Sequence, residues 1–147
     1  MQIKPKAILR ELVIIAVIVA AAFYGNRLVQ TWLGQKAIEQ AGYEQISFDA
    51  AKALANTQGK PMLVDFSAVW CPSCRKLDTK VFANPAVKMR IEQDYVYVRL
   101  EYESDDRALF ERYGVTGFPT LLLMDAAGNP YQRLGFTLDP EQFLTQL

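Results

Sequence analysis

The pattern of apolar and polar positions changes once along the chain. Residues 12–25 form an uncharged apolar stretch, whereas the later part alternates short apolar runs with Gly, Pro, Asp and Asn. Short β-prone runs between such turn residues predict strands, and apolar residues at helical spacing after Ser, Asn or Asp predict helices. The pattern predicts strands over 62–67, 95–100 and 121–124, and helices over 48–57, 71–80, 85–92, 105–113 and from 140 onward. This alternation predicts an α/β domain over residues 45–147.

The amino-terminal stretch is predicted to enter a membrane, because Lys4, Lys6 and Arg10 precede it and favour a cytoplasmic amino terminus. It is shorter than the roughly 20 residues that span a bilayer, and its small residues would suit cleavage of a signal peptide. Further apolar residues, with Trp32 at an interface position, favour a retained anchor instead. We therefore expect a cytoplasmic segment at 1–11, an anchor at 12–33, a tether or helix extension at 34–44, and a domain on the periplasmic side of a bacterial inner membrane.

The two cysteines of the chain stand in the run Trp-Cys-Pro-Ser-Cys at 70–74, directly after the predicted strand 62–67. At the start of a helix, free backbone N–H groups and the helix dipole stabilise a thiolate, so Cys71 is the expected nucleophile. Cys74, one turn further on, is placed to attack the mixed disulfide that Cys71 forms with a partner. The sequence therefore predicts dithiol–disulfide exchange at a redox-active Cys71–Cys74 pair.

Other uses of the two thiols fit the sequence less well. A zinc or iron–sulfur site needs about four Cys or His ligands, and the chain has two cysteines and no histidine. A structural disulfide across so short a loop would remove little entropy from the unfolded chain. A pair of inert buried thiols fits poorly with the neighbouring Pro and Ser. We therefore expect neither a metal nor an organic cofactor.

Charge argues against nucleic acid as a partner. The chain has 16 basic and 16 acidic residues and a formal net charge of zero, without a run rich in Lys or Arg. The lack of histidine also excludes Ser-His and Cys-His catalysis within this chain.

Over residues 47–147 the chain resembles the thioredoxin-like family. Asp65, six residues before Cys71, matches the buried aspartate of that family, and Gly-Phe-Pro-Thr at 117–120 matches its cis-proline loop. Within the family the chain is most similar to the periplasmic C-terminal domain of the DsbD thiol:disulfide interchange protein, through the runs at 59–61 and 81–87. The short spacing from Cys74 to Pro119 disfavours the cytochrome c maturation thioredoxins, which are the second possibility within the family.

The resemblance implies a thioredoxin-like fold, with a central mixed sheet flanked by helices. It also implies that Asp65 accepts the proton that leaves Cys74, and that Trp70, Phe118 and Pro119 contact the partner protein. Burial of the Asp65 carboxyl would raise its pKa toward neutrality, which suits that role. Arg99 lies in the strand where thioredoxin has a lysine near the buried aspartate, but an exposed position on that strand fits the sequence equally well.

The function expected from these features is reduction of protein disulfides by a membrane-tethered periplasmic oxidoreductase. An upstream membrane thiol reductase of the DsbD type would supply electrons, and oxidised periplasmic proteins would receive them. The dipeptide at 72–73 matches neither thioredoxin nor the oxidase DsbA, so an oxidant of the DsbA kind stays open. A binding or holdase module with incidental cysteines is a further alternative.

Overall fold

A mixed four-stranded sheet forms the centre of the protein in this computed structural model, which describes residues 5–104 and 107–147. The strand order is β2-β1-β3-β4, with β1 parallel to β2 and antiparallel to β3, and β3 antiparallel to β4. The strands are β1 (Met62–Ser67), β2 (Val96–Glu101), β3 (Thr120–Met124) and β4 (Pro130–Leu134).

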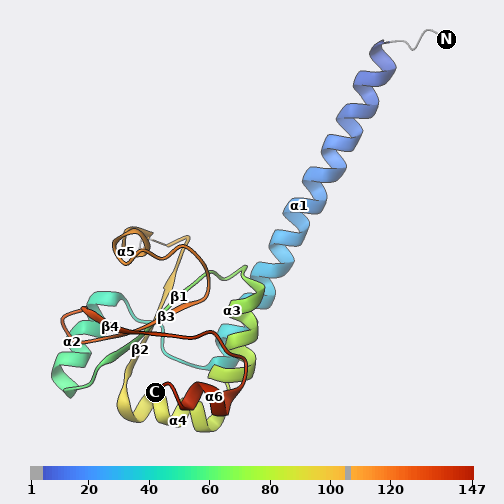
Figure 1. Cartoon of the computed structure of the whole chain (residues 1–147). Helices are drawn as coiled ribbons and strands as arrows, with labels where there is room; N and C mark the ends of the chain where they lie inside the picture. The colour runs from blue at the N-terminus through green and yellow to red at the C-terminus, as the bar shows by residue number, and fades with distance from the viewer. Residues whose placement is uncertain (1–4, 105–106) are drawn as a thin grey trace.

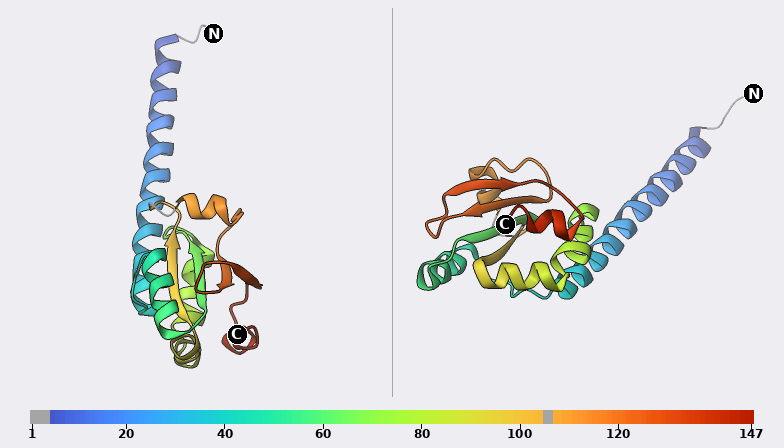
Figure 2. Two further views of the ribbon diagram at one scale, coloured as in Figure 1. Left: turned by 90° about the vertical axis from the view of Figure 1, so that its left-hand side faces the viewer. Right: turned by 60° about the horizontal axis from the view of Figure 1, so that its bottom comes forward.

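Helices cover both faces of this sheet (Figures 1 and 2). On one face, α2 (Phe48–Gln58) and α5 (Arg107–Arg112) enclose an apolar cluster. On the other face lie α3 (Pro72–Leu77), η1 (Asp78–Phe82), α4 (Pro85–Asp94) and α6 (Pro140–Leu144). Every residue of β1 is buried as a result, with alternate side chains facing opposite layers. The mixed sheet flanked by helices that the sequence predicted is confirmed.

The face to which Asp65 belongs follows from this alternation. Met62, Val64 and Phe66 pack in the cluster under α2 and α5, whereas Leu63 packs in the cluster under η1, α4 and α6. Asp65 shares the face of Leu63 and therefore points toward the layer that contains α3 and η1. Its register partner across the parallel pair is Arg99.

Local sequence signals set most helix boundaries. The Ser47 side chain accepts a hydrogen bond from the backbone N–H of Ala50 and begins α2, and Gly59 ends that helix in the left-handed conformation at φ 64°. The predicted active-site helix begins at Pro72, with Cys71 as its N-cap, and becomes a π-helical segment, η1, after Leu77. The predicted helix over 105–113 is described from Arg107, because residues 105–106 lie outside the described residues.

The amino-terminal helix α1 (Pro5–Ala41) projects from the domain as one long rod (Figure 1). From Ile8 to Ala41 it is long and apolar enough to cross a membrane, and its most apolar window has a mean hydropathy of 2.1 and is not buried in the structure. The segment 34–44, expected to be a tether or a helix extension, continues α1 through Ala41. Ala37 and Ala41 are buried there, so the end of α1 packs against the domain.

Candidate active site

Two thiols lie at the junction of β1 and α3, in opposite surroundings. Cys71 caps the amino terminus of α3, and its Sγ accepts a hydrogen bond from the backbone N–H of Cys74 at 3.2 Å. No disulfide joins the two cysteines in the structure. Cys71 retains 7% of its surface exposed, whereas Cys74 retains 1%. Both cysteines are therefore buried, Cys74 more completely than Cys71.

These surroundings separate the acidities of the two groups. A hydrogen bond from the Cys74 thiol, assisted by the backbone N–H groups of Cys74 and Ser73, lowers the pKa of Cys71 from 9.0 to about 6. The same thiol–thiol hydrogen bond, together with burial, raises the pKa of Cys74 well above its usual value. At neutral pH the site consequently holds a thiolate at Cys71 next to a protonated Cys74.

Residues from a distant loop complete the surface beside Cys71. The Phe118–Pro119 peptide bond is cis, and the Cys71 thiol lies 3.9 Å from the Phe118 carbonyl oxygen. Trp70 packs edge-to-face against Phe118 with ring centroids 6.2 Å apart. The structure thus brings Trp70, Phe118 and Pro119, the predicted partner-contacting residues, to the nucleophile.

A buried charged cluster lies beneath the thiols, between the sheet and η1. Asp65 is 1% exposed, and its Oδ2 accepts hydrogen bonds from the Tyr97 hydroxyl at 3.1 Å and from Nη1 of Arg99 at 3.3 Å. The same Nη1 bonds both carboxylate oxygens of Asp78, at 2.9 and 3.0 Å. Nε of Arg99 donates to Glu101 at 2.6 Å. Arg99 is therefore buried among three carboxyl groups, which decides between its two predicted positions.

One guanidinium does not fully offset the burial of these carboxyl groups. Burial raises the pKa of Asp65 from 3.8 to about 6, although Arg99 and the Tyr97 hydroxyl act in the opposite direction. Burial likewise raises the pKa of Asp78 to about 7 against the effect of Arg99, and the nearby Asp65 adds to the rise. The Asp65 Oδ1 is buried without a hydrogen-bond partner among the described residues. Both carboxyl groups can therefore exchange protons near neutral pH.

Sequence reasoning missed Asp78 and Tyr97 as neighbours of the site. A usable signal was present, because Cys71, Cys74 and Asp78 are spaced three and four residues apart and so share one helix face. Tyr97 stands two residues before Arg99 in β2, on the same face of the sheet.

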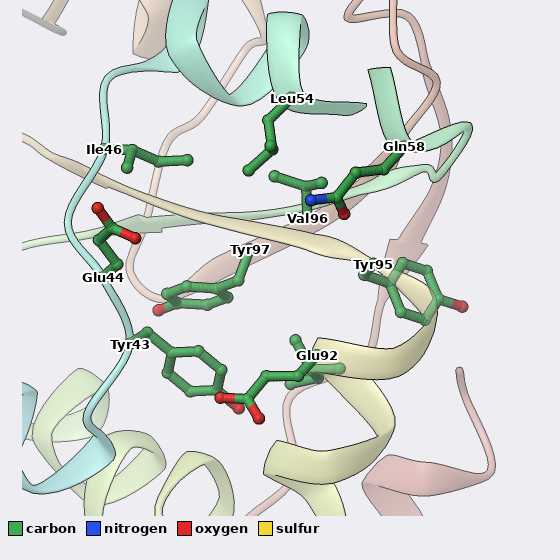
Figure 3. Close-up of a pocket in the computed structure, with 10 residues that line it drawn as sticks. Tyr43, Glu44, Ile46, Leu54, Gln58, Glu92, Tyr95, Val96 and Tyr97 are labelled. Carbon is green, nitrogen blue, oxygen red and sulfur yellow. The ribbon is translucent and has the colours of Figure 1, made fainter. Parts of the chain in front are cut away.

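A separate pocket of about 240 Å³ lies between the 43–46 segment, α2, α4 and β2 (Figure 3). Its lining includes Tyr43 and Tyr97, whose rings lie 4.2 Å apart, but neither cysteine. Across the described residues, no group of three or more His, Cys, Asp or Glu side chains is arranged to hold a metal ion. The thiol pair is therefore the candidate reactive site among the described residues.

Comparison with known proteins places these features in a family. Residues 43–126 match the sequence model of a family described as thioredoxin-like. The thiol:disulfide interchange protein DsbD of Cronobacter sakazakii is 29% identical over 142 residues, which cover 89% of this chain and 25% of that protein. The chain spans about a quarter of the length of the first such relatives.

Solved structures show the same likeness. A putative disulphide-isomerase from Bacteroides thetaiotaomicron is 28% identical with a TM-score of 0.62, covering 71% of this chain and 87% of that one. The C-terminal domain of Neisseria meningitidis DsbD in the oxidised form shares the fold at a TM-score of 0.53 and 24% identity, covering 70% and 95% of the two chains. Because the family model matches more than half of the chain and these structures overlay most of it, the chain belongs to the thioredoxin-like family.

Proposed function

We propose that this protein is a thiol:disulfide oxidoreductase that reduces disulfides of other proteins through Cys71 and Cys74. The observation that carries the proposal is the asymmetry of the pair: Cys71, the N-cap of α3, has its pKa lowered to about 6, while the pKa of the more deeply buried Cys74 is raised. A nucleophile and a resolving thiol need these two protonation states at neutral pH.

The exchange proceeds in two displacements. The Cys71 thiolate attacks one sulfur of the substrate disulfide, whose S–S bond breaks, and the other substrate sulfur leaves as a thiolate that takes up a proton. Cys74 then loses its proton and attacks Sγ of Cys71, which releases the second substrate thiolate. Two electrons pass to the substrate, and Cys71 and Cys74 remain as a disulfide.

Asp65 is the proposed acceptor of the proton that leaves Cys74. Its support is the charge interaction in which ionised Asp65 raises the pKa of Cys74, together with the pKa of about 6 of Asp65 itself. A carboxylate with that pKa is ionised at neutral pH and can therefore act as a base.

The partner segment is proposed to lie along the loop at Phe118 and Pro119, with Trp70 at its side. The support is their placement around Cys71, where the Phe118 carbonyl lies beside the nucleophile. An extended peptide recognised by main-chain groups fits such a loop, and it leaves broad freedom in the client sequence.

We further propose that α1 anchors the protein in the bacterial inner membrane, with the domain in the periplasm. The supports are the length and hydropathy of α1 and relatives named as thiol:disulfide interchange proteins. A membrane thiol reductase of the DsbD type would then reduce the Cys71–Cys74 disulfide, and oxidised periplasmic proteins would be the clients.

An oxidant of the DsbA kind is the second candidate, and the low pKa of Cys71 is the observation that favours it. Stabilising the thiolate favours the reduced pair, which makes its disulfide a stronger oxidant. Acid quenching of intact cells, alkylation of free thiols and mass analysis of the 71–74 peptide decide between the two. A mainly reduced pair supports the reductase, and a mainly oxidised pair supports the oxidant.

Exchange with proteins is tested by a Cys74→Ser variant, which cannot resolve mixed disulfides. We expect partner proteins to accumulate on Cys71 and to be released by a reductant, as seen on non-reducing gels. Recovery of no adduct from cells, with a Cys71→Ser and Cys74→Ser double variant as the control, would exclude the proposed function.

A further inference from the structure

The end of α1 is fixed against the active-site loop by a close helix-to-backbone contact. Gly34 is buried, and a Cβ atom at this position would lie 1.7 Å from the carbonyl oxygen of Val69, two residues before Cys71. Ala37 and Ala41 continue the same buried stripe at spacings of three and four residues. No side chain larger than hydrogen fits at residue 34 unless the loop or the helix moves.

Polar contacts extend this joint along α1 toward the amino terminus. Nη1 of Arg75, in α3, donates to Oε1 of Gln30 at 2.6 Å. Arg27 forms an ion pair with Glu103, which follows β2. These contacts therefore join two separate parts of the domain to α1, on the amino-terminal side of the Gly34 contact.

Trp70 lies beside the part of α1 where the helix projects from the domain. A pocket of about 310 Å³ is lined by Phe23, Asn26, Arg27 and Gln30 from α1 and by Trp70 from the active-site loop. Residue 23 belongs to the apolar stretch, so this pocket joins the predicted membrane segment to the residue next to Cys71.

The length of the helix sets the position of this pocket relative to the bilayer. At 1.5 Å per residue, the uncharged stretch 12–25 spans about 21 Å. One further turn, 8–11, which includes the Arg10–Glu11 ion pair, brings the span to about 27 Å, close to the roughly 30 Å of a bilayer hydrocarbon core. Tyr24 and Trp32 are exposed on either side of this limit, and such residues are typical of the membrane–water interface. With α1 in a membrane, Trp70 comes to the bilayer surface.

We propose that α1 and the active-site loop form one rigid unit that holds Cys71 at the membrane surface, where it meets its partner, the membrane thiol reductase proposed above as the electron donor. The inference rests on the proposed function and deepens it. Two thiols of that partner reduce the Cys71–Cys74 disulfide, and two electrons and two protons pass as the partner becomes oxidised. A fixed orientation favours a partner that is itself confined to the bilayer, because both pairs of reacting sulfur atoms then lie at the same distance from the membrane surface.

The depth of Trp70 tests the position without any reference to activity. The chain has two tryptophans, so a Trp32→Phe variant leaves Trp70 as the single emitter. In phosphatidylcholine vesicles, we expect lipids brominated near the headgroup end of the acyl chain to quench Trp70 emission. Adding Gly34→Leu should remove most of that quenching, whereas adding Gly25→Leu should not, since nothing lies within 4 Å of a Cβ at residue 25. Absence of quenching in the Trp32→Phe chain would overturn the proposal.

The reaction itself is tested with the same glycine pair. The probe is an apolar transmembrane peptide with a reduced two-cysteine loop directly outside the bilayer, and the reference is that loop as a soluble peptide. Relative to Gly25→Leu, we expect Gly34→Leu to slow reduction of the Cys71–Cys74 disulfide by the membrane probe about tenfold. Its reaction with the soluble loop should change by less than about twofold, because the thiol chemistry is untouched.

The outcomes separate the inference from the function on which it rests. Equal rates of Gly34→Leu and Gly25→Leu with the membrane probe would overturn the rigid joint. Failure of the unmodified chain to react with the soluble loop would instead overturn the proposed function. Where Gly34→Leu loses its fold, seen as loss of reaction with both probes, Gly34→Ala against Gly25→Ala makes the same comparison, since one methyl group already meets the Val69 carbonyl.

Discussion

Cys71 and Cys74 are chemically identical groups that their surroundings make different. Cys71 accepts hydrogen bonds at the start of α3, whereas the more deeply buried Cys74 donates to it through its thiol and its backbone N–H. Position along the helix, set by the Cys-Pro-Ser-Cys spacing, therefore decides which sulfur is ionised. At this scale the reactivity depends on a few hydrogen bonds that single substitutions can remove.

The thiol–thiol hydrogen bond gives the first prediction. Cys74→Ala removes the donor with the largest effect on Cys71, so the pKa of Cys71 should rise from about 6. Cys74→Ser retains a donor in the form of a hydroxyl and should keep the pKa lower than Cys74→Ala does. The ultraviolet absorbance of the thiolate, followed against pH, measures both. Identical titrations of the two variants would show that the backbone N–H groups alone stabilise the thiolate.

Asp65 gives the second prediction. As a base it works when ionised, so resolution of the mixed disulfide by Cys74 should accelerate as pH rises through about 6. Asp65→Asn should lack this inflection and slow resolution about a hundredfold at neutral pH. Stopped-flow kinetics with a mixed disulfide preformed on Cys71 measure the step. The exposed Asp49→Asn variant is the matched control, and a wild-type pH–rate profile in Asp65→Asn would exclude the role.

The sequence predicted some residues of the site and left the position of Arg99 open, for a physical reason. Cys71, Cys74 and Asp65 are placed by a strand and a helix that adjoin in the chain, so local patterns suffice. The burial of Arg99 depends on Asp78, which comes from η1 and meets it only after the sheet and helix have packed. Contacts of that kind carry no local periodicity, and both positions for Arg99 stayed open.

At the scale of elements, capping residues predicted boundaries better than apolar runs did. Ser47, Asn84 and Asp139 begin helices as their side chains suggest, each accepting a hydrogen bond from a backbone N–H. The π-helical turn of η1 has no such signal, because an i to i+5 pattern arises from packing rather than from composition. The packing of the end of α1 against the domain was not predictable either, because small residues such as Ala37 and Ala41 also suit a tether.

The cap of α4 gives the third prediction. Oδ1 of Asn84 accepts hydrogen bonds from the backbone N–H groups of Ala86 at 2.9 Å and Val87 at 3.4 Å. Asn84→Ala should lower the free energy of unfolding by about 1 kcal/mol, because these donors lose their partner. Urea denaturation measures the change. Asn84→Asp retains an acceptor and should lie close to the wild type; an equal loss in both variants would contradict the capping role.

For the molecule as a whole, the buried carboxyl groups make folding sensitive to pH. Asp65 and Asp78 have their pKa values raised from 3.8 to about 6 and about 7, so the folded state holds protons that the unfolded state has released. Their contribution to stability is complete below about pH 3.8 and is lost as pH rises through the folded values. The depressed pKa of Cys71 acts in the opposite sense, between about 6 and 9.

This balance gives the fourth prediction. Between about pH 4 and 6, the Asp65 proton contributes a fall in the free energy of unfolding of up to about 1.4 kcal/mol per pH unit. Asp65→Asn lacks this proton and should show a flatter dependence, and it also relieves the effect of Asp65 on the pKa of Asp78. Urea midpoints of the full chain in detergent across this range measure it. Parallel curves for the two proteins would contradict the raised pKa.

The contact between Gly34 and Val69 also constrains how this sequence can diverge. Residue 34 faces a backbone carbonyl, and every amino acid presents the same carbonyl at position 69. No compensating substitution at position 69 can therefore make room for a side chain at position 34. Related chains that keep this joint should hold glycine there whichever residue stands at position 69. A chimaera that places the domain on a foreign membrane helix should need a glycine at the same distance from the domain.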